Sequence, residues 1–363
     1  MTTNVTSDQL RHRAAALPRV ALAHLPTPLE ELPRLTERLA GPRIFIKRDD
    51  CTGLAFGGNK TRHNEFLLGQ ALADGADLVV WGAGVQSNNC RQTAAACARL
   101  GLDIHLVLAR GESSTELQGN LLLDHIAGAS YEFVDATIGP QLDQVIAERA
   151  QRFRASGRVV YEHSRALWGR AAVSYVLAMA EICDQLRERQ VTPAAVYVSA
   201  GGATGAGLSL GAALLAPRCP VHSILPIRWP WDEAVGIAEM ANDAARLLDL
   251  PAKLTSEQVS VAGAYVGSGY GRATPAGMEA LALLARLEGV LLDPAYTAKA
   301  MAALVADARA GRYRADQAVV FVHTGGTPAL FAYAADLERM LPRVVHAPPG
   351  PDGAAPTRRS RRV

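Results

Sequence analysis

The sequence lacks the residue patterns that hold structural metal ions or a disulfide framework. It contains five cysteines at irregular spacings, with no Cys-x-x-Cys pair and no cysteine and histidine series at ligand spacing. We therefore expect no structural zinc and no other metal site. An odd number of scattered cysteines also favours a reducing compartment, so we expect a cytoplasmic protein.

Long apolar runs and an excess of charge of one sign are missing as well. No stretch reaches the roughly 18 apolar residues of a membrane span, and no apolar signal segment stands near the N-terminus. The formal net charge is only +2, and the basic excess lies in the Pro/Gly/Arg-rich segment 347–363, which we expect to be disordered. Neither a membrane nor a nucleic acid is therefore expected as a partner.

What the sequence does contain is a regular alternation of strand and helix patterns. Its 363 residues are 49% hydrophobic, enough for one large or two ordinary domains. Short apolar runs separated by helical patterns of about 10–15 residues predict βαβ units and parallel sheets flanked by helices, an α/β fold. The expected strands cover 43–47, 77–81, 104–108, 131–134, 159–161, 195–199, 221–227 and 319–322, and the expected helices 61–74, 91–100, 117–126, 141–154, 173–187, 206–215, 235–248, 275–288, 298–310 and 328–339.

A first candidate site is the turn Gly57-Gly58-Asn59-Lys60, which directly precedes a helical pattern. Ligands of parallel sheets bind beyond the carboxyl ends of the strands, where this turn stands. The two glycines let the backbone approach a ligand closely. Lys60 falls in the first helical turn, where the helix dipole and unpaired N–H groups disfavour its charged form. Such a lysine can form a Schiff base with an aldehyde cofactor; the alternative is a solvated lysine at a helix start.

A second candidate is the turn Ser199–Gly205, which follows a strand and opens a helix. Its small residues leave backbone amides uncovered, and Thr204 adds a hydroxyl, as in helix N-termini that hold phosphate. The Gly-Lys-Ser/Thr ending of a nucleotide P-loop is missing. The turn therefore predicts a phosphate site; the alternative is close packing of a helix against a strand.

A third turn, at 82–89, combines Gly-x-Gly with a cluster of polar residues. A dinucleotide site would need an acidic residue at the end of the next strand, but Asp103 precedes that strand, so a dinucleotide is not favoured. Ser87, Asn88 and Asn89 instead crowd the start of a helix, where a carboxylate can bind. The same side chains can also simply cap the helix.

Three further features lie at expected helix starts or strand ends. Tyr270 stands within the Gly-rich segment 267–271, and Tyr296 follows the Asp293-Pro294 turn. Each tyrosine can line a ligand pocket or pack as an ordinary aromatic residue. The segment His323-Thr324-Gly325-Gly326 ends the last expected strand, at the same pole as the other turns.

Six motifs in colinear order together resemble the D-cysteine desulfhydrase and 1-aminocyclopropane-1-carboxylate (ACC) deaminase family. These pyridoxal-phosphate enzymes have the tryptophan synthase β-like fold, called fold type II. The resemblance extends from about Leu17 to Tyr333. The motifs are Gly57-Gly58-Asn59-Lys60-Thr61-Arg62, Gln86-Ser87-Asn88, Arg91-Gln92-Thr93-Ala94-Ala95, Gly269-Tyr270-Gly271, Leu292-Asp293-Pro294-x-Tyr296-Thr297-x-Lys299-Ala300-Met301 and His323-Thr324-Gly325-Gly326.

The resemblance implies an architecture and a set of site residues. A large domain of residues 1–58 and 170–346 and a small domain of residues 59–169 would hold pyridoxal 5'-phosphate between them, in a homodimer that acts on a small amino acid. The implied catalytic residues are Lys60, Ser87, Tyr270 and Tyr296. The implied substrate contacts are Ser87, Asn88, Asn89, Tyr270 and Tyr296, and the implied cofactor contacts are Asn59, Lys60, Asn88, Ala200, Gly201, Gly202, Ala203, Thr204, Thr297 and Thr324.

Two of these residues bear on the reaction. The resemblance places Thr297 and Thr324 near the pyridine nitrogen, where a hydroxyl leaves the ring less protonated than an acid would and suits prompt elimination. ACC deaminases have an acid and an aliphatic residue at these two positions. We therefore expect a lyase for α,β-elimination from a small β-substituted amino acid such as D-cysteine, giving a 2-keto acid and ammonia. ACC ring opening, β-replacement, racemisation and a non-catalytic phosphate-binding role are the alternatives.

Several positions depart from the family pattern and concern the substrate. His63 stands where lysine is usual, so a cation beside the phosphate is lost or becomes pH-dependent. Asn89 replaces a longer polar side chain, and the segment 109–115 differs from the family loop. An arginine pair in segment 162–170 could receive a second anionic group of the substrate, or the segment could be an exposed loop. Its side chains that could reach the pocket are Arg165, Trp168 and Arg170.

Overall fold

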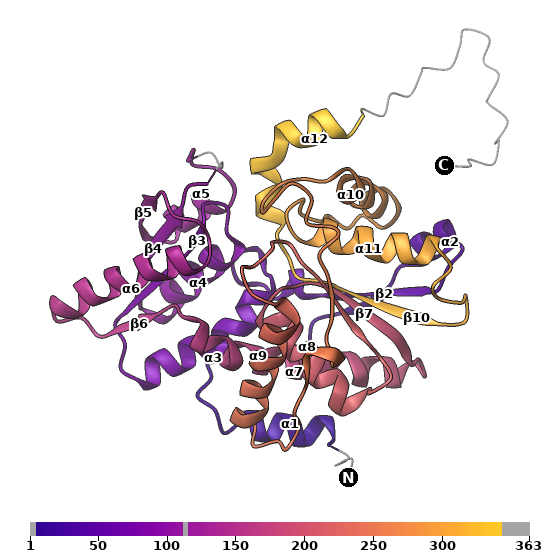
Figure 1. Cartoon of the computed structure of the whole chain (residues 1–363), viewed down its shortest axis with the longest axis horizontal. Helices are drawn as coiled ribbons and strands as arrows, with labels where there is room; N and C mark the ends of the chain where they lie inside the picture. The colour runs from indigo at the N-terminus through magenta and orange to yellow at the C-terminus, as the bar shows by residue number, and fades with distance from the viewer. Residues whose placement is uncertain (1–4, 112–114, 343–363) are drawn as a thin grey trace, which may run out of the picture.

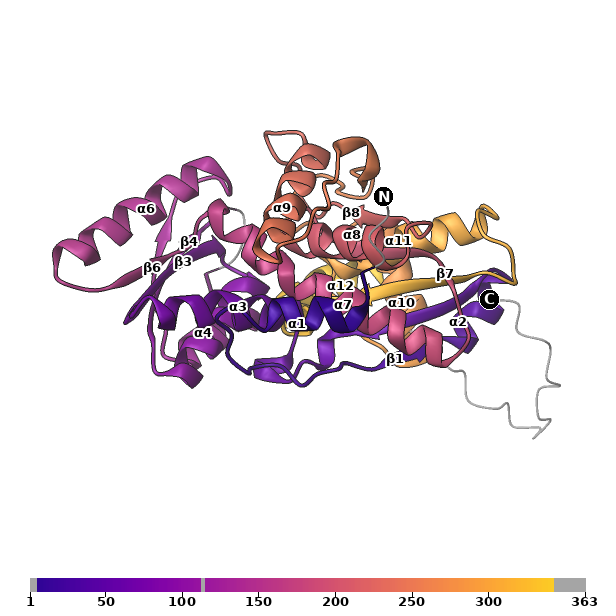
Figure 2. The ribbon, with the colours of Figure 1, turned by 90° about the horizontal axis from the view of Figure 1, so that it is seen from below.

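The computed structural model describes residues 5–111 and 115–342, in which two sheets are flanked by helices. The expected disordered segment 347–363 and part of the divergent segment 109–115 lie outside these ranges. Figures 1 and 2 show the smaller sheet at one side of the molecule and the larger sheet, with most of the helices, at the other. The prediction of mainly parallel sheets flanked by helices is confirmed.

The larger sheet has six strands in the order β1-β2-β10-β7-β8-β9. Only β1 is antiparallel to its neighbour; the other pairs are parallel. Helices cover both faces, which explains why the central strands are continuously apolar and buried. The strands are β1 (Leu29–Glu31), β2 (Arg43–Arg48), β7 (Pro193–Ser199), β8 (Val221–Ile224), β9 (Ser260–Ala262) and β10 (Ala318–His323).

Different helices pack on the two faces of this sheet. One face carries α7 (Trp168–Glu188) and α8 (Ala203–Leu215), whose apolar side chains meet Phe45, Val196 and Val320. The other face carries α2 (Pro33–Leu39), α10 (Pro275–Glu288) and α11 (Thr297–Arg309). The remaining helices of this part are α1 (Ser7–Ala14), α9 (Glu233–Leu247) and α12 (Ala334–Met340).

The smaller sheet has four parallel strands in the order β5-β4-β3-β6. Helix α6 packs on one face through Leu142 and Ile146, while α3 and α4 lie on the other. The strands are β3 (Leu78–Gly84), β4 (Asp103–Ala109), β5 (Ser130–Val134) and β6 (Val160–Glu162), and the helices are α3 (Asn59–Ala73), α4 (Asn88–Leu100), α5 (Gly119–Ile126) and α6 (Pro140–Ala155).

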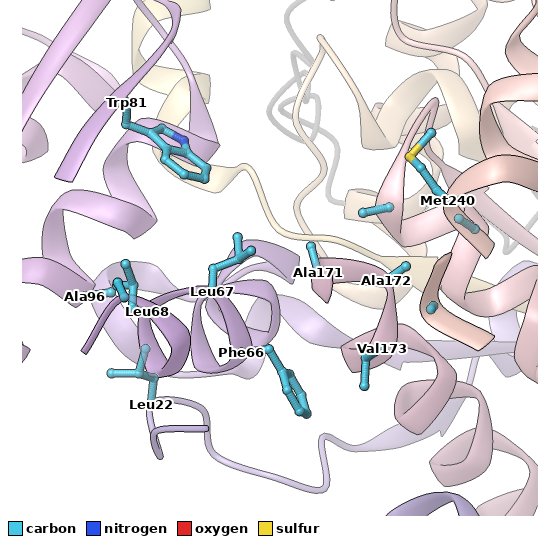
Figure 3. Packing of buried hydrophobic residues seen from close by; sticks show 14 of the residues in the cluster. Leu22, Phe66, Leu67, Leu68, Trp81, Ala96, Ala171, Ala172, Val173 and Met240 are labelled. Carbon is cyan, nitrogen blue, oxygen red and sulfur yellow. The ribbon is translucent and has the colours of Figure 1, made fainter. Parts of the chain in front are cut away.

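A continuous apolar core joins the smaller sheet to helices of the larger part. It extends from Trp81 on β3 through Phe66 and Leu67 on α3 to Ala171 on α7 and Met240 on α9, as Figure 3 shows. The two sheets are the features on which the predicted two-domain division depends. The boundaries of this division at 58/59 and 169/170 stay a prediction, because the apolar core contains residues on both sides of each boundary.

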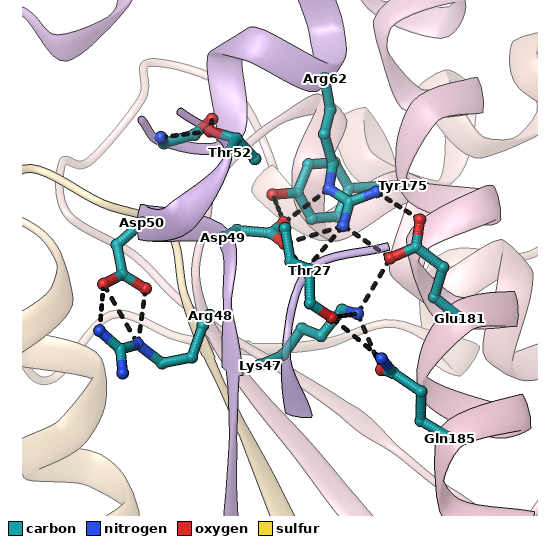
Figure 4. A network of polar contacts seen from close by, with 11 residues as sticks. Thr27, Lys47, Arg48, Asp49, Asp50, Thr52, Arg62, Tyr175, Glu181 and Gln185 are labelled. Atoms are coloured by element: carbon teal, nitrogen blue, oxygen red, sulfur yellow. Dashed lines mark hydrogen bonds and ion pairs between the residues drawn. The ribbon is translucent and has the colours of Figure 1, made fainter. Parts of the chain in front are cut away.

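A buried polar network fixes α3 against α7 and β2 (Figure 4). Arg62 on α3 donates to Asp49 (2.9 and 3.0 Å) and to Glu181 on α7 (both 2.8 Å). Lys47 on β2 lies 2.9 Å from Glu181, and the Tyr175 hydroxyl donates to Asp49. Because each charge has partners of opposite sign, the network can be buried at the base of the helix that carries Lys60.

Some elements differ from their sequence prediction. Helices α1 and α2 and the short strands β1 and β9 were not predicted, and the expected helix 328–339 is a 3-10 helix, Thr327–Tyr333, followed by α12. The segment Arg165–Glu188 is long and apolar enough to pass for a membrane span, contrary to the expectation from the sequence. Of its apolar 18-residue window 67% is buried, however, because α7 is packed between other helices and the larger sheet. Its packing is that of a core helix.

Candidate active site

The predicted site residues converge on one cavity of about 220 Å³. Its walls come from the start of α3, the turns after β3 and β7, the end of β10 and the Tyr270 segment. The predicted residues that line it are Asn59, Lys60, Ser87, Asn88, Asn89, Ala200, Gly201, Gly202, Ala203, Thr204, Tyr270, Tyr296 and Thr324. Within the described part of the chain, Thr297 is the predicted site residue that does not line the cavity.

Lys60 is placed by a glycine turn that no other residue could form. Gly57 and Gly58 have φ angles of +66° and +126°, and a Cβ on Gly57 would lie 2.0 Å from the Asp50 carbonyl oxygen. Lys60 follows in the first turn of α3, as predicted. Burial lowers the pKa of the Lys60 amine to about 8. The cause of this lowered pKa is therefore burial among protein atoms and not the helix dipole expected from the sequence. Among the described residues, none forms a hydrogen bond or ion pair with this amine.

The turn before α8 presents backbone amides to the same cavity. Gly202 is the N-cap of α8 and has no side chain that could accept hydrogen bonds from the first N–H groups of the helix. The Thr204 hydroxyl accepts from Asn59 Nδ2 (2.9 Å) and lies 3.1 Å from His63 Nε2. This turn can hold a phosphate, which accepts hydrogen bonds and carries the charge that a helix N-terminus favours.

His63 does not supply the cation that the sequence left open. Burial, together with the nearby Lys60 and Arg62 charges, lowers the pKa of its imidazole well below the ordinary value. The side chain is therefore neutral at physiological pH, and its contact with Thr204 is a hydrogen bond between neutral groups. A pH-dependent charge near neutrality at this position is not supported.

The start of α4 forms the opposite wall. The Ser87 hydroxyl accepts from the backbone N–H groups of Asn89 (3.1 Å) and Cys90 (3.2 Å), so Ser87 caps the helix. Its own hydrogen remains available for a ligand. With Asn88 and Asn89 beside it, this helix start offers donors to a carboxylate.

The orientation of the Asn88 side chain is fixed by two residues behind it. Arg91 Nε, which can only donate, bonds to Asn120 Oδ1 (2.8 Å). Asn120 must therefore present its Nδ2 group to Asn88 Oδ1, at 2.9 Å. The Asn88 amide in turn has its Nδ2 group left for the cavity. Asn88 is thus a donor to whatever binds there, and Asn120, which the sequence did not single out, determines this.

Tyr270 and Tyr296 form a pair on the remaining wall. Their hydroxyls are hydrogen-bonded to each other, and their rings lie 5.9 Å apart at 74°. Gly84 at the end of β3 makes room, since a Cβ there would lie 3.2 Å from the Tyr270 ring. Burial raises the pKa of Tyr270 to about 12 and that of Tyr296 well above its ordinary value, so both stay protonated at neutral pH.

The two predicted threonines differ in position. Thr324 lines the cavity, and its carbonyl accepts from the backbone N–H of Asn59 (3.1 Å). Thr297 is fully buried, and its hydroxyl donates to Asp293 Oδ1 (2.7 Å) at the start of α11. Its predicted contact with the cofactor stays a prediction.

Further side chains line the cavity that the sequence did not assign to it. Trp229 and Trp231 follow β8, and His163 follows β6, so the rule that ligands bind beyond strand ends could have indicated all three. Of the three side chains in segment 162–170 that could reach the pocket, Trp168 lines the cavity, whereas Arg165 and Arg170 are not among the lining residues. Arg165 instead lies over the Trp231 ring, 3.8 Å from its centroid, which favours the exposed-loop alternative over an arginine pair at the pocket.

Comparison with protein families gives one match over most of the chain. The model of the family described as pyridoxal-phosphate dependent enzymes matches residues 20–325. A D-cysteine desulfhydrase from Klebsiella pneumoniae (strain 342) is 41% identical over 327 residues, which cover 87% of this chain and 96% of that protein.

Solved structures resemble the fold over nearly its whole length. The crystal structure of an ACC deaminase homologue has a TM-score of 0.84 and 34% identity, covering 92% of this chain and 99% of that one. A diaminopropionate ammonia lyase from Escherichia coli has a TM-score of 0.66 at 16% identity, covering 93% and 92%. The second likeness concerns the fold alone.

Proposed function

Because this chain belongs to the family of pyridoxal-phosphate dependent enzymes, we propose that it is a lyase for α,β-elimination from small β-substituted amino acids of the D-cysteine type. The products would be a 2-keto acid, ammonia and the leaving group. One observation supports this most: the Lys60 amine, with its lowered pKa and no hydrogen-bond partner among the described residues, lies in the same cavity as a phosphate turn and a carboxylate site.

The family, the fold class and the cofactor predicted from the sequence are confirmed by these comparisons. The residues of the cavity also fit pyridoxal phosphate. Gly201 and Gly202 have no side chains, so their backbone N–H groups are open to a phosphate. A Cβ on Gly201 would lie 3.1 Å from Trp229. We propose that residues 200–204 hold the phosphate, Lys60 the aldehyde carbon and Asn88 a ring oxygen. When bound, the cofactor supplies an electron sink for the bond broken at the substrate Cα.

The side chains of the cavity divide the remaining work. The helix start at Ser87 would hold the substrate carboxylate and so aim the Cα–H bond at Lys60. A neutral Lys60 amine can accept that proton, and its lowered pKa of about 8 leaves roughly a tenth of it uncharged at pH 7, far more than for an ordinary lysine. Tyr270 and Tyr296 remain protonated and would line the side from which the leaving group departs.

A keto-acid release screen tests this proposal. With cofactor-loaded protein, D-cysteine should give keto acid and sulfide, whereas ACC should give at least about tenfold less keto acid per unit time if elimination is the main activity. Both enantiomers of cysteine, with ACC and D-serine, form the panel. Keto acid from ACC alone would replace the proposal by ring opening, and racemised amino acid without keto acid would replace it by racemisation.

Asn120 provides a second test, since it orients Asn88 without touching the cavity in the described structure. Asn120→Leu should weaken pyridoxal phosphate binding about tenfold, the effect of one lost or misdirected hydrogen bond. Binding is measured by absorbance titration of cofactor-free protein. Gln144→Leu, at an exposed amide on α6, is the control. An unchanged dissociation constant for a folded Asn120→Leu variant would contradict the orienting role.

The proposal also includes the oligomeric state of the protein, its location in the cell and its domain boundaries. We propose a homodimer in the cytoplasm, as the family resemblance implies, with a small domain at 59–169. The five cysteines are unpaired, which suits a reducing compartment.

A further inference from the structure

All four tryptophans of the chain line the cavity: Trp81, Trp168, Trp229 and Trp231. Aromatic residues make up only 6% of the sequence, so this concentration is not a matter of composition. Trp81 is buried, whereas the other three are partly exposed. Large partly exposed rings around a cavity mark a surface that a ligand covers.

Three of these tryptophans form one wall, which we call the aromatic mouth. Trp168 and Trp229 have ring centroids 6.2 Å apart at 54°, and Trp229 stacks on Trp231 at 4.8 Å and 9°. The mouth comes from two separate segments, the start of α7 and the turn after β8. Ile138 and Leu142 extend the same lining, so its surface is mainly apolar.

The mouth begins beside the reacting amine and leads away from it. Lys60 lies close enough to His163 to help lower the pKa of that imidazole, to about 4, although burial is the larger cause. The His163 ring lies 6.5 Å from Trp168, the inner member of the mouth. Trp231, at the far end, carries the exposed Arg165 on its ring. A substrate side chain that left Lys60 in this direction would pass along the rings.

The charges around the mouth offset each other. Asp143 is the one carboxylate among the described lining residues; burial raises the pKa of its carboxyl, and the nearby Arg165 charge partly opposes this shift. Arg165 also occupies the cation position over the rings, at 3.8 Å from the Trp231 centroid and 5.5 Å from that of Trp168. A positively charged ligand group would have to displace Arg165. A neutral apolar group needs no such displacement.

We propose that the aromatic mouth binds the β-substituent of the substrate and that the preferred substrates are S-substituted cysteines bearing an aromatic or large apolar group on sulfur. This inference rests on the proposed elimination. The Cα proton is removed and the Cβ–S bond breaks, with the sulfur taking the electron pair and a proton to leave as a thiol. The three-carbon enamine that remains takes up one water, giving pyruvate and ammonia. Indole rings suit both parts of such a thioether, because sulfur and aromatic groups each pack favourably against them.

The direct test compares S-benzylcysteine with cysteine of the same enantiomer on cofactor-loaded protein. We expect kcat/KM to be at least about tenfold higher for S-benzylcysteine, mainly through a lower KM, because the apolar benzyl group is transferred from water to the aromatic mouth. Trp231→Ala should lower this ratio about tenfold, and Trp231→Phe, which keeps a ring, should retain most of it. Phe331→Ala, at an aromatic residue that is 73% exposed and outside the cavity lining, should leave the ratio unchanged.

Cofactor absorbance, recorded for every variant, separates lost folding from lost selectivity. The inference would be overturned if the ratio of kcat/KM for S-benzylcysteine to that for cysteine were near one in the unmodified protein, or if Trp231→Ala left this ratio unchanged. Turnover of cysteine would in either case still support the proposed elimination. Faster turnover of 2,3-diaminopropionate than of S-benzylcysteine would also overturn it, in favour of a cation at the mouth. If none of these amino acids gave keto acid, the proposed function would fall and the inference with it.

Discussion

Lys60→Ala should reduce keto-acid release by on the order of 10³-fold or more. The substitution removes both the amine that would hold the cofactor and the base proposed for the Cα proton. No other lysine can replace it. Lys299 also has a pKa lowered to about 8, by burial, but its amine donates to the Val266 carbonyl (2.8 Å) and does not line the cavity.

The assay uses protein incubated with excess pyridoxal phosphate, because weaker cofactor binding alone could otherwise explain a loss. Lys253→Ala, at an exposed lysine, is the matched control and should keep full activity. Lys60→Arg should be as inactive as Lys60→Ala, since a guanidinium stays protonated at any working pH. Activity within about tenfold of the unmodified protein in Lys60→Ala would remove this residue from the chemistry.

Asp49→Ala should have the largest effect on stability, lowering the free energy of unfolding by about 3–5 kcal/mol. Asp49 is fully buried and accepts hydrogen bonds from Arg62, Thr27 and Tyr175. Removing its carboxylate leaves the buried Arg62 and Lys47 short of negative charge. Because the network holds α3, which carries Lys60, we expect weaker cofactor binding as well.

The effect of Asp49→Ala should depend on pH. Burial alone would raise the pKa of this carboxyl, but Arg62 and Lys47 bring it below the ordinary value. A lowered pKa contributes stability at pH values above the unfolded value, near 4, and this contribution is lost as the pH falls through the folded value. The difference in unfolding free energy between the two proteins should therefore be largest near neutral pH and shrink in acid.

Urea unfolding at several pH values measures this difference. Asp316→Ala is the control, because Asp316 pairs with Arg314 on the surface and solvent weakens that pair. It should unfold like the unmodified protein. If Asp49→Ala unfolded at the same urea concentration as the control, the network would be unimportant for stability.

The parts of this fold that the sequence predicts are those with short-range causes. Alternating apolar runs and helical periods located most strands and helices within a few residues, and the carboxyl ends of parallel strands share one edge. Lys60, Ser87, Thr204 and Thr324 could therefore be expected in one place from the sequence alone. Short elements such as β1 and β9 were missed because pairing with a neighbouring strand, and not their own sequence, makes them strands.

What the sequence did not predict depends on contacts between distant segments. The orientation of Asn88 depends on Asn120, and the neutral state of His63 depends on burial and on the charges beside it. The sequence left open whether Arg165 reaches the pocket as an anion ligand or lies in an exposed loop, and in the structure the Trp231 ring, which lies in another turn, holds its guanidinium. Such relationships need three-dimensional packing, which local patterns do not contain.

The most direct test of this account is to map the cofactor after borohydride reduction. The chain has only four lysines, Lys47, Lys60, Lys253 and Lys299, so digestion and mass spectrometry can assign the adduct without ambiguity. We predict one pyridoxyl group per chain, on Lys60. An adduct on another lysine, or none in protein fully incubated with pyridoxal phosphate, would contradict the account.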